Sequence, residues 1–577
     1  MKVDTVRLKG LIEAARGLKP ADLCIKGCRL VNVFSGRIES SDLAVHNGFI
    51  AGWGDYEGIQ TIRADGMYVS PGFIDGHVHI ESSLLCPANF CASVLPWGTS
   101  AVVADPHEIA NVLGLDGIRY FLECARRLPL DIFVNLPSCV PASHLETSGA
   151  SLSGVDLQSL LPNDNLLGLA EMMNFPGVIG ADPNVMDKLL LFQDMLIDGH
   201  CPQLSGRDLN AYMAGGIGSD HECTTFEEAA EKLARGMSVM IRQGSQSKDL
   251  AKLIGVVNDS TWPRCMFVSD DVHPDDLIGK GHMNHIINGA MADGMDPVRA
   301  ITLASWTTAN HFRLRRRGAL APGFLADFSL SPTLNPWNPV RVFKGGVEVG
   351  RERKLIVDPS CWVMPPMPGS PMRMDPVSPK QLVVPAKPGK LRVIGALEET
   401  LFTQKLLMDP KIEDGCVVCD MDRDLLKLAV YNRYVAGTRP AVGFIHGLGL
   451  KKGAIATSIA HDSHNIIAAG VSDADITSAV SALVETGGGM AAAVGDLIEV
   501  LPLPIAGLMS PLPATEVSAR LKVLKALIRD WGAKLENPYM ALSFLALPVI
   551  PELKITDLGL VEVSSFAHVD LFEMASR

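Results

Sequence analysis

Short apolar runs alternate with longer stretches of helical periodicity eight times between Met67 and about Asp271. This alternation predicts strand–helix pairs whose strands lie parallel in one sheet. Eight such pairs within roughly 200–250 residues fit a single (β/α)8 barrel. The apolar runs are MYVSPGFID, TSAVVAD, DIFVN, LLGLAE, IDGH, GGIGSDH, SVMIRQ and CMFVSDD.

Two of the intervening stretches carry a clear helical pattern, with apolar residues recurring every three or four positions. In the segment 115–128 these residues are Ile118, Phe121, Leu122, Ala125 and Leu128. In the segment 226–237 they are Phe226, Ala229, Ala230 and Leu233. Thr224 and Thr225 precede the second segment and predict the start of its helix, because a threonine hydroxyl can accept from a free amide of the first turn. We expect both helices to bury these faces.

Strand-like patterns of a different kind flank the barrel. Segments 21–33 and 41–54 precede it, and segments 320–332 and 340–350 follow it, each with clustered or alternating apolar residues beside turn residues. We therefore expect the two flanks to form one small β domain. A proline-rich passage after them, VMPPMPGSPMRMDPVSP, predicts a linker to a last region of mixed strands and helices.

The predicted fold class is α/β, with a (β/α)8 barrel, a small β-sandwich domain made from both flanks, and an additional C-terminal α+β domain. A chain of 577 residues is too long for one hydrophobic core, which agrees with several domains. The predicted boundaries are residues 1–72 plus 315–365 for the small β domain, 73–314 for the barrel and 366–577 for the C-terminal domain.

Composition and charge mainly argue against two kinds of partner, nucleic acids and membranes. The net charge is −13, and the one dense basic cluster is the short string RLRRR at 313–317, so we expect no nucleic-acid partner. The longest apolar stretch, 487–510, is broken by Asp496, Glu499 and several prolines, so we expect no membrane helix. The N-terminal segment lacks the apolar core of a signal peptide, which predicts a cytoplasmic location.

Residues able to bind metals end six of the eight predicted strands. Because the carboxyl ends of barrel strands meet at one rim, these side chains should converge. The two histidines of a His-x-His string on a strand point to the same face. The residues are His77 and His79 on the first strand, His107 and Glu108 after the second, Glu171 on the fourth, His200 on the fifth, His221 on the sixth, and Asp270 with Asp271 on the eighth.

Each of these residues alone has a simpler explanation. A single histidine is more often structural than a ligand, Glu171 could favour a helix N-terminus, and Asp270 could cap a turn. Those explanations do not account for the joint arrangement. Four histidines and two carboxylates suit divalent first-row metals and are enough for two ions that share a bridging ligand. The predicted ligands are His77, His79, Glu171, His200, His221 and Asp270.

The string PGFIDGHVHIESS, together with Glu171, His200, His221 and Asp270, resembles the amidohydrolase superfamily. Many members of that superfamily bridge two metals with a carbamylated lysine, where this chain has Glu171. The longer strings DPHEIANVLG, SDHE, SDDVHPDDL, HDSHNII and ETGGGM resemble the adenine deaminase family within it, over nearly the full length. This resemblance implies hydrolysis of adenine to hypoxanthine and ammonia, a reaction of purine salvage or catabolism.

The resemblance also implies roles for individual residues. Asp270 would take a proton from the attacking water and pass it to the leaving amine, as a general acid–base group. Asp271 would contact the purine. Attack at C6 also needs an acid near N1, for which Glu81, Glu108 and His273 are candidates, and the pair His107–Glu108 is favoured. Glu81 could equally be a solvent-facing loop carboxylate. The C-terminal residues His461, Asp462, His464 and Asn465 could form no more than a polar turn.

The implied cofactors are two divalent ions, manganese or iron, and the ligand types also permit zinc. We expect a homo-oligomer with a small-molecule substrate, adenine. Two alternatives remain at this point. A cyclic amide hydrolase of the dihydroorotase or hydantoinase type is disfavoured by Glu171 in place of a bridging lysine. A non-catalytic barrel scaffold would be expected to have lost ligands, and none of the expected ligands is missing from the sequence.

Overall fold

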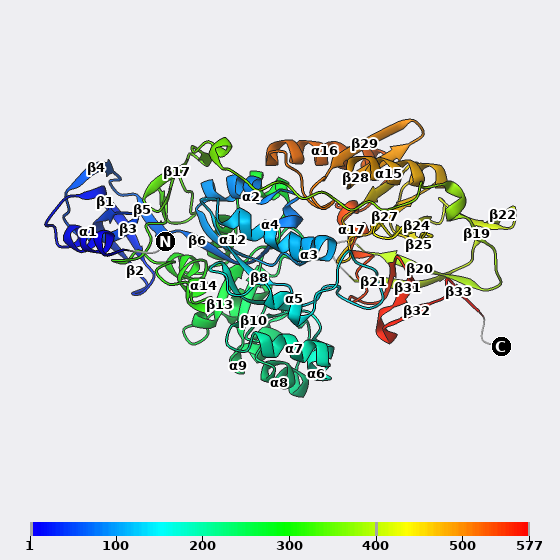
Figure 1. The fold of residues 1–577 in the computed structure, drawn as a ribbon, viewed down its shortest axis with the longest axis horizontal. Coiled ribbons are helices and arrows are strands. Elements are labelled where there is room, and N and C mark those ends of the chain that lie inside the picture. Colours follow the sequence, from blue (N-terminus) through cyan, green and yellow to red (C-terminus); the bar gives the residue numbers. More distant parts are fainter. Residues whose placement is uncertain (1–3, 398–401, 575–577) are drawn as a thin grey trace.

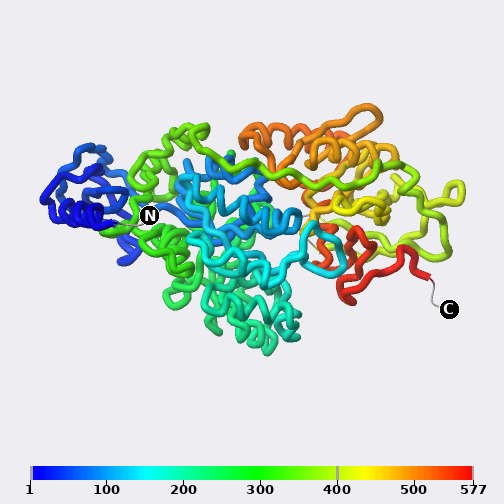
Figure 2. The backbone as a smooth tube through the Cα atoms, in the orientation of Figure 1, coloured from blue at the N-terminus to red at the C-terminus, as the bar shows by residue number. Residues whose placement is uncertain are grey.

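The computed structural model describes residues 4–397 and 402–574 and arranges them along one long axis (Figure 1). A small β domain lies at one end, the barrel in the middle, and the C-terminal region at the other end. Figure 2 shows the proline-rich segment running from the small domain past the barrel to the C-terminal region. Within the described ranges, no helix is long and apolar enough to cross a membrane.

Both flanks of the barrel contribute strands to one nine-stranded sheet. The strand from the N-terminal flank that joins the two halves is β5, which pairs antiparallel with β15 from the far side of the barrel. Helix α1 (Thr5–Ala15) packs beside this sheet. The domain boundaries given above stay predictions. The strands are β1 (Ala21–Asn32), β2 (Arg37–His46), β3 (Phe49–Trp53), β4 (Gly58–Arg63), β5 (Tyr68–Pro71), β15 (Phe328–Ser331), β16 (Arg341–Lys344), β17 (Val347–Arg351) and β18 (Lys354–Leu355).

The predicted (β/α)8 barrel is confirmed, and each of the eight apolar runs overlaps a strand of its wall, the last run overlapping two, β13 and β14. Two parallel sheets make up its wall. They meet where β14 follows β13 along the chain and where the Gly218 amide donates to the Ile197 carbonyl, 3.0 Å away. The strands are β6 (Phe73–His79), β7 (Thr99–Ala104), β8 (Asp131–Leu136), β9 (Leu166–Met172), β10 (Leu196–Gly199), β11 (Ser219–Asp220), β12 (Ser238–Arg242), β13 (Cys265–Val268) and β14 (Asp270–Asp271).

Helices surround the barrel, and the two that the sequence indicated most clearly are present as α4 and α9. Helix α9 begins after Thr225, whose hydroxyl accepts from the Glu228 amide as the capping signal predicts. The prediction that Phe226 is buried is wrong, because this first helical residue is 46% exposed. The helices are α2 (Pro87–Val94), α3 (His107–Leu113), α4 (Leu115–Ala125), α5 (Gly154–Gln158), α6 (Phe175–Ile179), α7 (Pro183–Leu191), α8 (Gly206–Ala214), α9 (Phe226–Ala234), α10 (Leu250–Leu253), α11 (Pro274–Gly279), α12 (Met283–Ala292), α13 (Pro297–Leu303) and α14 (Trp306–His311).

The C-terminal region is built on a second, mixed sheet of nine strands. Helix α15 (Asp473–Thr486) packs on one face of this sheet, whereas α16 (Ala514–Asp530) and α17 (Pro538–Phe544) lie where the region meets the barrel (Figure 1). The main strands are β20 (Lys390–Ala396), β21 (Thr403–Met408), β24 (Leu425–Tyr431), β25 (Ala441–His446), β26 (Ala454–Thr457), β27 (Ile466–Gly470), β28 (Gly489–Val494), β29 (Leu497–Pro502) and β33 (Phe572–Glu573).

Hydrogen bonds between the barrel and the C-terminal region hold the two together. The Thr147 amide donates to Asp557 Oδ1 at 2.8 Å, and the Asn465 side chain donates to the Thr147 carbonyl at 2.8 Å. The Thr556 hydroxyl donates to the Leu145 carbonyl at 2.6 Å. One hydrophobic cluster also contains buried residues from both parts, so the barrel mouth is covered by the C-terminal region.

Candidate metal centre

The six predicted metal ligands lie together at the mouth of the barrel. Five of them are buried, and His200 is half-buried. Each one stands at the carboxyl end of its strand or directly after it, so the barrel itself sets the spacing. The ligand atoms separate into two groups that have one carboxylate in common.

The first group contains His77, His79 and Asp270. Their atoms His77 Nε2 and His79 Nε2 are 3.1 Å apart, and each faces Asp270 Oδ1, at 3.5 and 3.2 Å respectively. Glu171 Oε1 lies 3.3 Å from His79 Nε2. Ligand atoms about 2.0–2.2 Å from one ion are separated from each other by roughly 3–4 Å, so this group fits a divalent metal.

The second group contains His200 and His221. Glu171 Oε2 lies 2.6 Å from His200 Nδ1 and 3.2 Å from His221 Nε2. Glu171 thus directs one oxygen to each group, which is the geometry of a bridging carboxylate. Glu222, which the sequence analysis did not single out, adds an oxygen 3.6 Å from His221 Nε2.

The charges of the site favour bound cations. Burial would raise the pKa of Glu171, but hydrogen bonds from His200, His221 and His79 outweigh it and hold that pKa well below its ordinary value. Burial lowers the pKa of His79, yet Asp270 and Glu171 together raise it well above the usual range. A buried site whose carboxylates stay ionised and draw positive charge onto imidazoles has the chemistry that divalent ions satisfy.

Arg242 at the end of β12 is a site residue that the sequence analysis missed. Its guanidinium contacts Glu222 and donates to Asp270 Oδ2 at 2.9 Å. Burial raises the pKa of Asp270, but Arg242 and then His77 and His79 outweigh that effect and keep it well below the ordinary value. The signal was present, because Arg242 stands next to the end of the seventh apolar run, SVMIRQ, where the other predicted strands also carry their site residues.

The two aspartates of β14 face different partners. Asp270 has a φ of 59°, a left-handed conformation that L-residues adopt at a cost and that turns its carboxylate toward the histidines. Asp271 Oδ1 instead accepts from the Ser82 hydroxyl at 2.5 Å. Ser82 also lies 3.0 Å from Glu108 Oε1, and it therefore links Asp271 to the first turn of α3. Ser82 was part of the quoted string PGFIDGHVHIESS but was not selected.

His107 and Glu108 border the metal ligands. The atom His107 Nδ1 lies 3.4 Å from Asp105 Oδ2 and 3.5 Å from Glu171 Oε1. Burial raises the pKa of Glu108. Glu81 is 1% exposed, so the solvent-facing alternative for that residue is wrong. Burial and the neighbouring Glu108 raise the pKa of Glu81 to about 8.

The C-terminal region contributes to this mouth. His461 Nδ1 lies 3.7 Å from Glu108 Oε1, and Asp462 Oδ1 lies 3.9 Å from His107 Nε2. His464 is fully buried close by. The interpretation of 461–465 as no more than a polar turn is therefore insufficient, since two of its side chains face residues of the barrel rim.

The sequence of this chain matches two protein families and several full-length relatives. Residues 68–349 match the amidohydrolase family, and residues 400–567 match the adenine deaminase C-terminal domain. A protein of Syntrophobacter fumaroxidans named adenine deaminase is 63% identical, covering 99% of this chain and 100% of its own. A protein of Carboxydothermus hydrogenoformans named adenine deaminase 2 is 46% identical, covering 97% of this chain and 99% of its own. An adenine deaminase of Desulfatibacillum aliphaticivorans is 48% identical over 98% of this chain and 99% of its own.

Proposed function

Since the chain belongs to the adenine deaminase family of amidohydrolases, we propose that it hydrolyses adenine to hypoxanthine and ammonia at a centre of two divalent ions. The observation that carries the proposal is the splitting of Glu171 between two groups of imidazoles, with Oε1 facing His79 and Oε2 facing His200 and His221. An acid–base carboxylate, Asp270, stands beside the same centre.

One ion would be held by His77, His79, Asp270 and Glu171, and the other by Glu171, His200 and His221. When bound, divalent ions make water acidic enough to attack near neutral pH. Manganese or iron is our expectation for the resident metal, and zinc suits the same ligands. Arg242 holds the outer oxygen of Asp270 at 2.9 Å and so fixes the direction of the oxygen that faces the reacting atoms.

Asp270 moves one proton in this scheme. It accepts a proton from the attacking water as the oxygen bonds to C6, and it delivers that proton to the amine, which leaves as ammonia. A carboxylate with a lowered pKa is ionised before the reaction and is therefore ready to accept.

Glu108 protonates N1 of the ring as C6 is attacked. The second proton of the water stays on the new oxygen at C6 and then passes to Glu108, which is thereby protonated again. The ring leaves with a proton on N1 and a carbonyl at C6, so atoms and charges balance. Burial supports this role because it raises the pKa of Glu108 and favours the protonated acid. Asp271, held by Ser82 on the same side, contacts the purine.

Purified protein loaded with manganese should release ammonia from adenine and form hypoxanthine in equal amounts. We expect adenine to be preferred to adenosine by kcat/KM. The measurement is coupled ammonia detection with chromatography of the purine product, for both substrates at matched metal content. Comparable kcat/KM values for the two would show that the site accepts ribose and would contradict the assignment to the free base. The cytoplasmic location and the homo-oligomeric state stay predictions from the sequence.

A further inference from the structure

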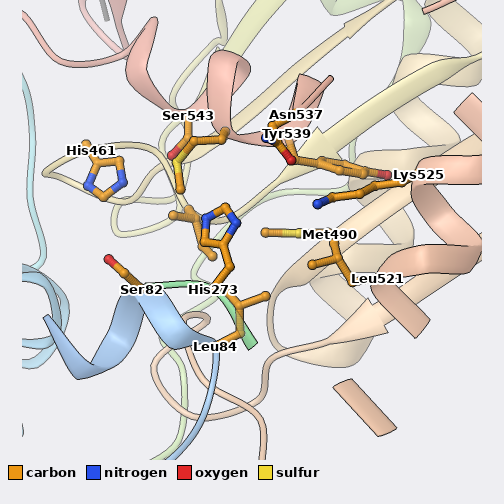
Figure 3. Close-up of a pocket in the computed structure, with 12 residues that line it drawn as sticks. Ser82, Leu84, His273, His461, Met490, Leu521, Lys525, Asn537, Tyr539 and Ser543 are labelled. Atoms are coloured by element: carbon orange, nitrogen blue, oxygen red, sulfur yellow. The ribbon is translucent and has the colours of Figure 1, made fainter. Parts of the chain in front are cut away.

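A hollow of about 470 Å³, including its open mouth, lies between the barrel and the C-terminal region (Figure 3). The barrel supplies Ser82, Leu84 and His273 to its wall, and the remaining lining residues come from the C-terminal region. Pockets for small organic ligands lie preferentially between domains. The place of this hollow, between the barrel and the C-terminal region, is therefore that of a ligand site.

One end of the hollow adjoins the catalytic groups. Ser82 lines it and touches both Asp271 and Glu108, at 2.5 and 3.0 Å. His461 lines the same end, and its Nδ1 atom is 3.7 Å from Glu108 Oε1. In Figure 3, Ser82 and His461 lie on one side of the hollow, and Lys525 and Tyr539 lie on the opposite side. A ligand that contacts Glu108 therefore lies at this end of the hollow.

The middle of the hollow suits a flat, uncharged heterocycle. Met490 and His273 point into it between the two ends, with Leu84 and Ile459 as further apolar walls. Burial, together with the Lys525 ammonium, lowers the pKa of His273 to about 4, so its ring is neutral at physiological pH. A neutral imidazole offers one donor and one acceptor, the combination that a purine edge presents. A thioether side chain packs well against aromatic rings.

The charge of the hollow disfavours a phosphorylated ligand. Among the described residues that line it, Lys525 is the one lysine or arginine. Its Nζ atom already lies 3.8 Å from Asp275 Oδ2. Phosphate sites usually offer several cationic donors, whereas the described residues of this wall include one lysine and no arginine.

Two of the C-terminal sequence strings that resemble the adenine deaminase family supply residues to the hollow. ETGGGM places Met490 at the start of β28, and HDSHNII places His461 at the inner end of the hollow. Gly489 has a φ of 147°, and a Cβ atom there would come within 2.2 Å of the Leu501 carbonyl oxygen. The glycine before Met490 is thus required for β28 to approach β29 closely and present Met490 to the hollow.

We propose that this hollow binds the imidazole side of the purine, leaving C6 at the metal centre, and that Met490 and His273 determine specificity for the free base. The inference rests on the proposed function and deepens it. The C-terminal region then acts as the part of the enzyme that recognises the substrate.

Two variants that fill the hollow test the inference, Met490→Trp and Lys525→Trp. Lys522→Trp is the matched control, because Lys522 is exposed on the same helix, α16, and does not line the hollow. Binding of hypoxanthine to the manganese-loaded proteins is measured by calorimetry, beside KM for adenine and metal content. We expect each filling variant to weaken hypoxanthine binding and raise KM at least ten-fold with metal content unchanged, while the control behaves as wild type. Met490→Leu should retain binding.

Unchanged hypoxanthine affinity in both filling variants, when they are folded and metal-loaded, would overturn the inference. Slower association and dissociation at the same affinity would also overturn it, since the hollow would then be an entrance and not a binding site. Absence of adenine turnover in the wild type would instead refute the proposed function, and the hypoxanthine measurement would still decide whether the hollow binds purines.

Discussion

Glu171→Gln will remove metal and activity together. The carboxylate contributes an oxygen to each group of imidazoles, and a neutral amide is a poor bridge between two cations. Loss of residues that merely support a metal ligand costs roughly 10–100-fold in metal affinity or activity, so loss of the bridge should exceed that range. The measurement is metal content by elemental analysis on the same samples used for ammonia release.

Two further variants make this experiment specific. Glu123→Gln on α4 makes the same chemical change at a half-buried position whose carboxylate pairs with Arg126 and Arg127 and contacts none of the metal ligands, and it should leave metal content and rate unchanged. Glu171→Lys, supplied with bicarbonate, tests whether a carbamate can replace the bridge. If Glu171→Gln keeps both its metal and its rate, Glu171 is only a structural carboxylate and the bridging interpretation is wrong.

Asp270→Asn and Asp271→Asn are expected to have different effects. Asp270 faces His77 and His79, whereas Asp271 accepts from Ser82 beside the hollow. If Asp270 transfers the water proton, Asp270→Asn should lower kcat by about 10²–10⁴-fold with little change in KM. Asp271→Asn should raise KM or relax the choice among purines.

Steady-state kinetics of both variants at matched metal content will decide between these roles. Matching is essential because Asp270 is also a predicted metal ligand, and a loss of metal would imitate a loss of proton transfer. Equal collapse of kcat in both variants with normal KM would defeat the division of roles. Mild effects of both substitutions would show that neither aspartate of β14 takes part in the reaction.

The barrel could be predicted from the sequence because its strands are short apolar runs, each with a polar residue at its carboxyl end. Even β11, which is only two residues long, was indicated by the string GGIGSDH that contains it. The convergence of His77, Glu171 and Asp270 needed no more than the rule that barrel strands end at one rim. The local sequence pattern and the geometry of the barrel were enough to predict where these residues lie.

The rest of the site depends on contacts between distant segments, which no local pattern encodes. Ser82 and Asp271 are 189 residues apart in sequence, and Asn465 bonds to a carbonyl 318 residues away. The prediction that Phe226 is buried was wrong for a different reason. It is the first residue of α9, and the periodicity of a helix does not show how far along that helix the packed surface extends.

The most direct test of the account is a metal titration of the stripped protein. A chelator should abolish ammonia release from adenine while the far-UV circular dichroism stays native, because a barrel of this size buries enough core to fold without metal. Adding Mn²⁺ or Fe²⁺ should then restore turnover, reaching its maximum at two equivalents per chain. Full deamination by the exhaustively metal-free protein would contradict the account.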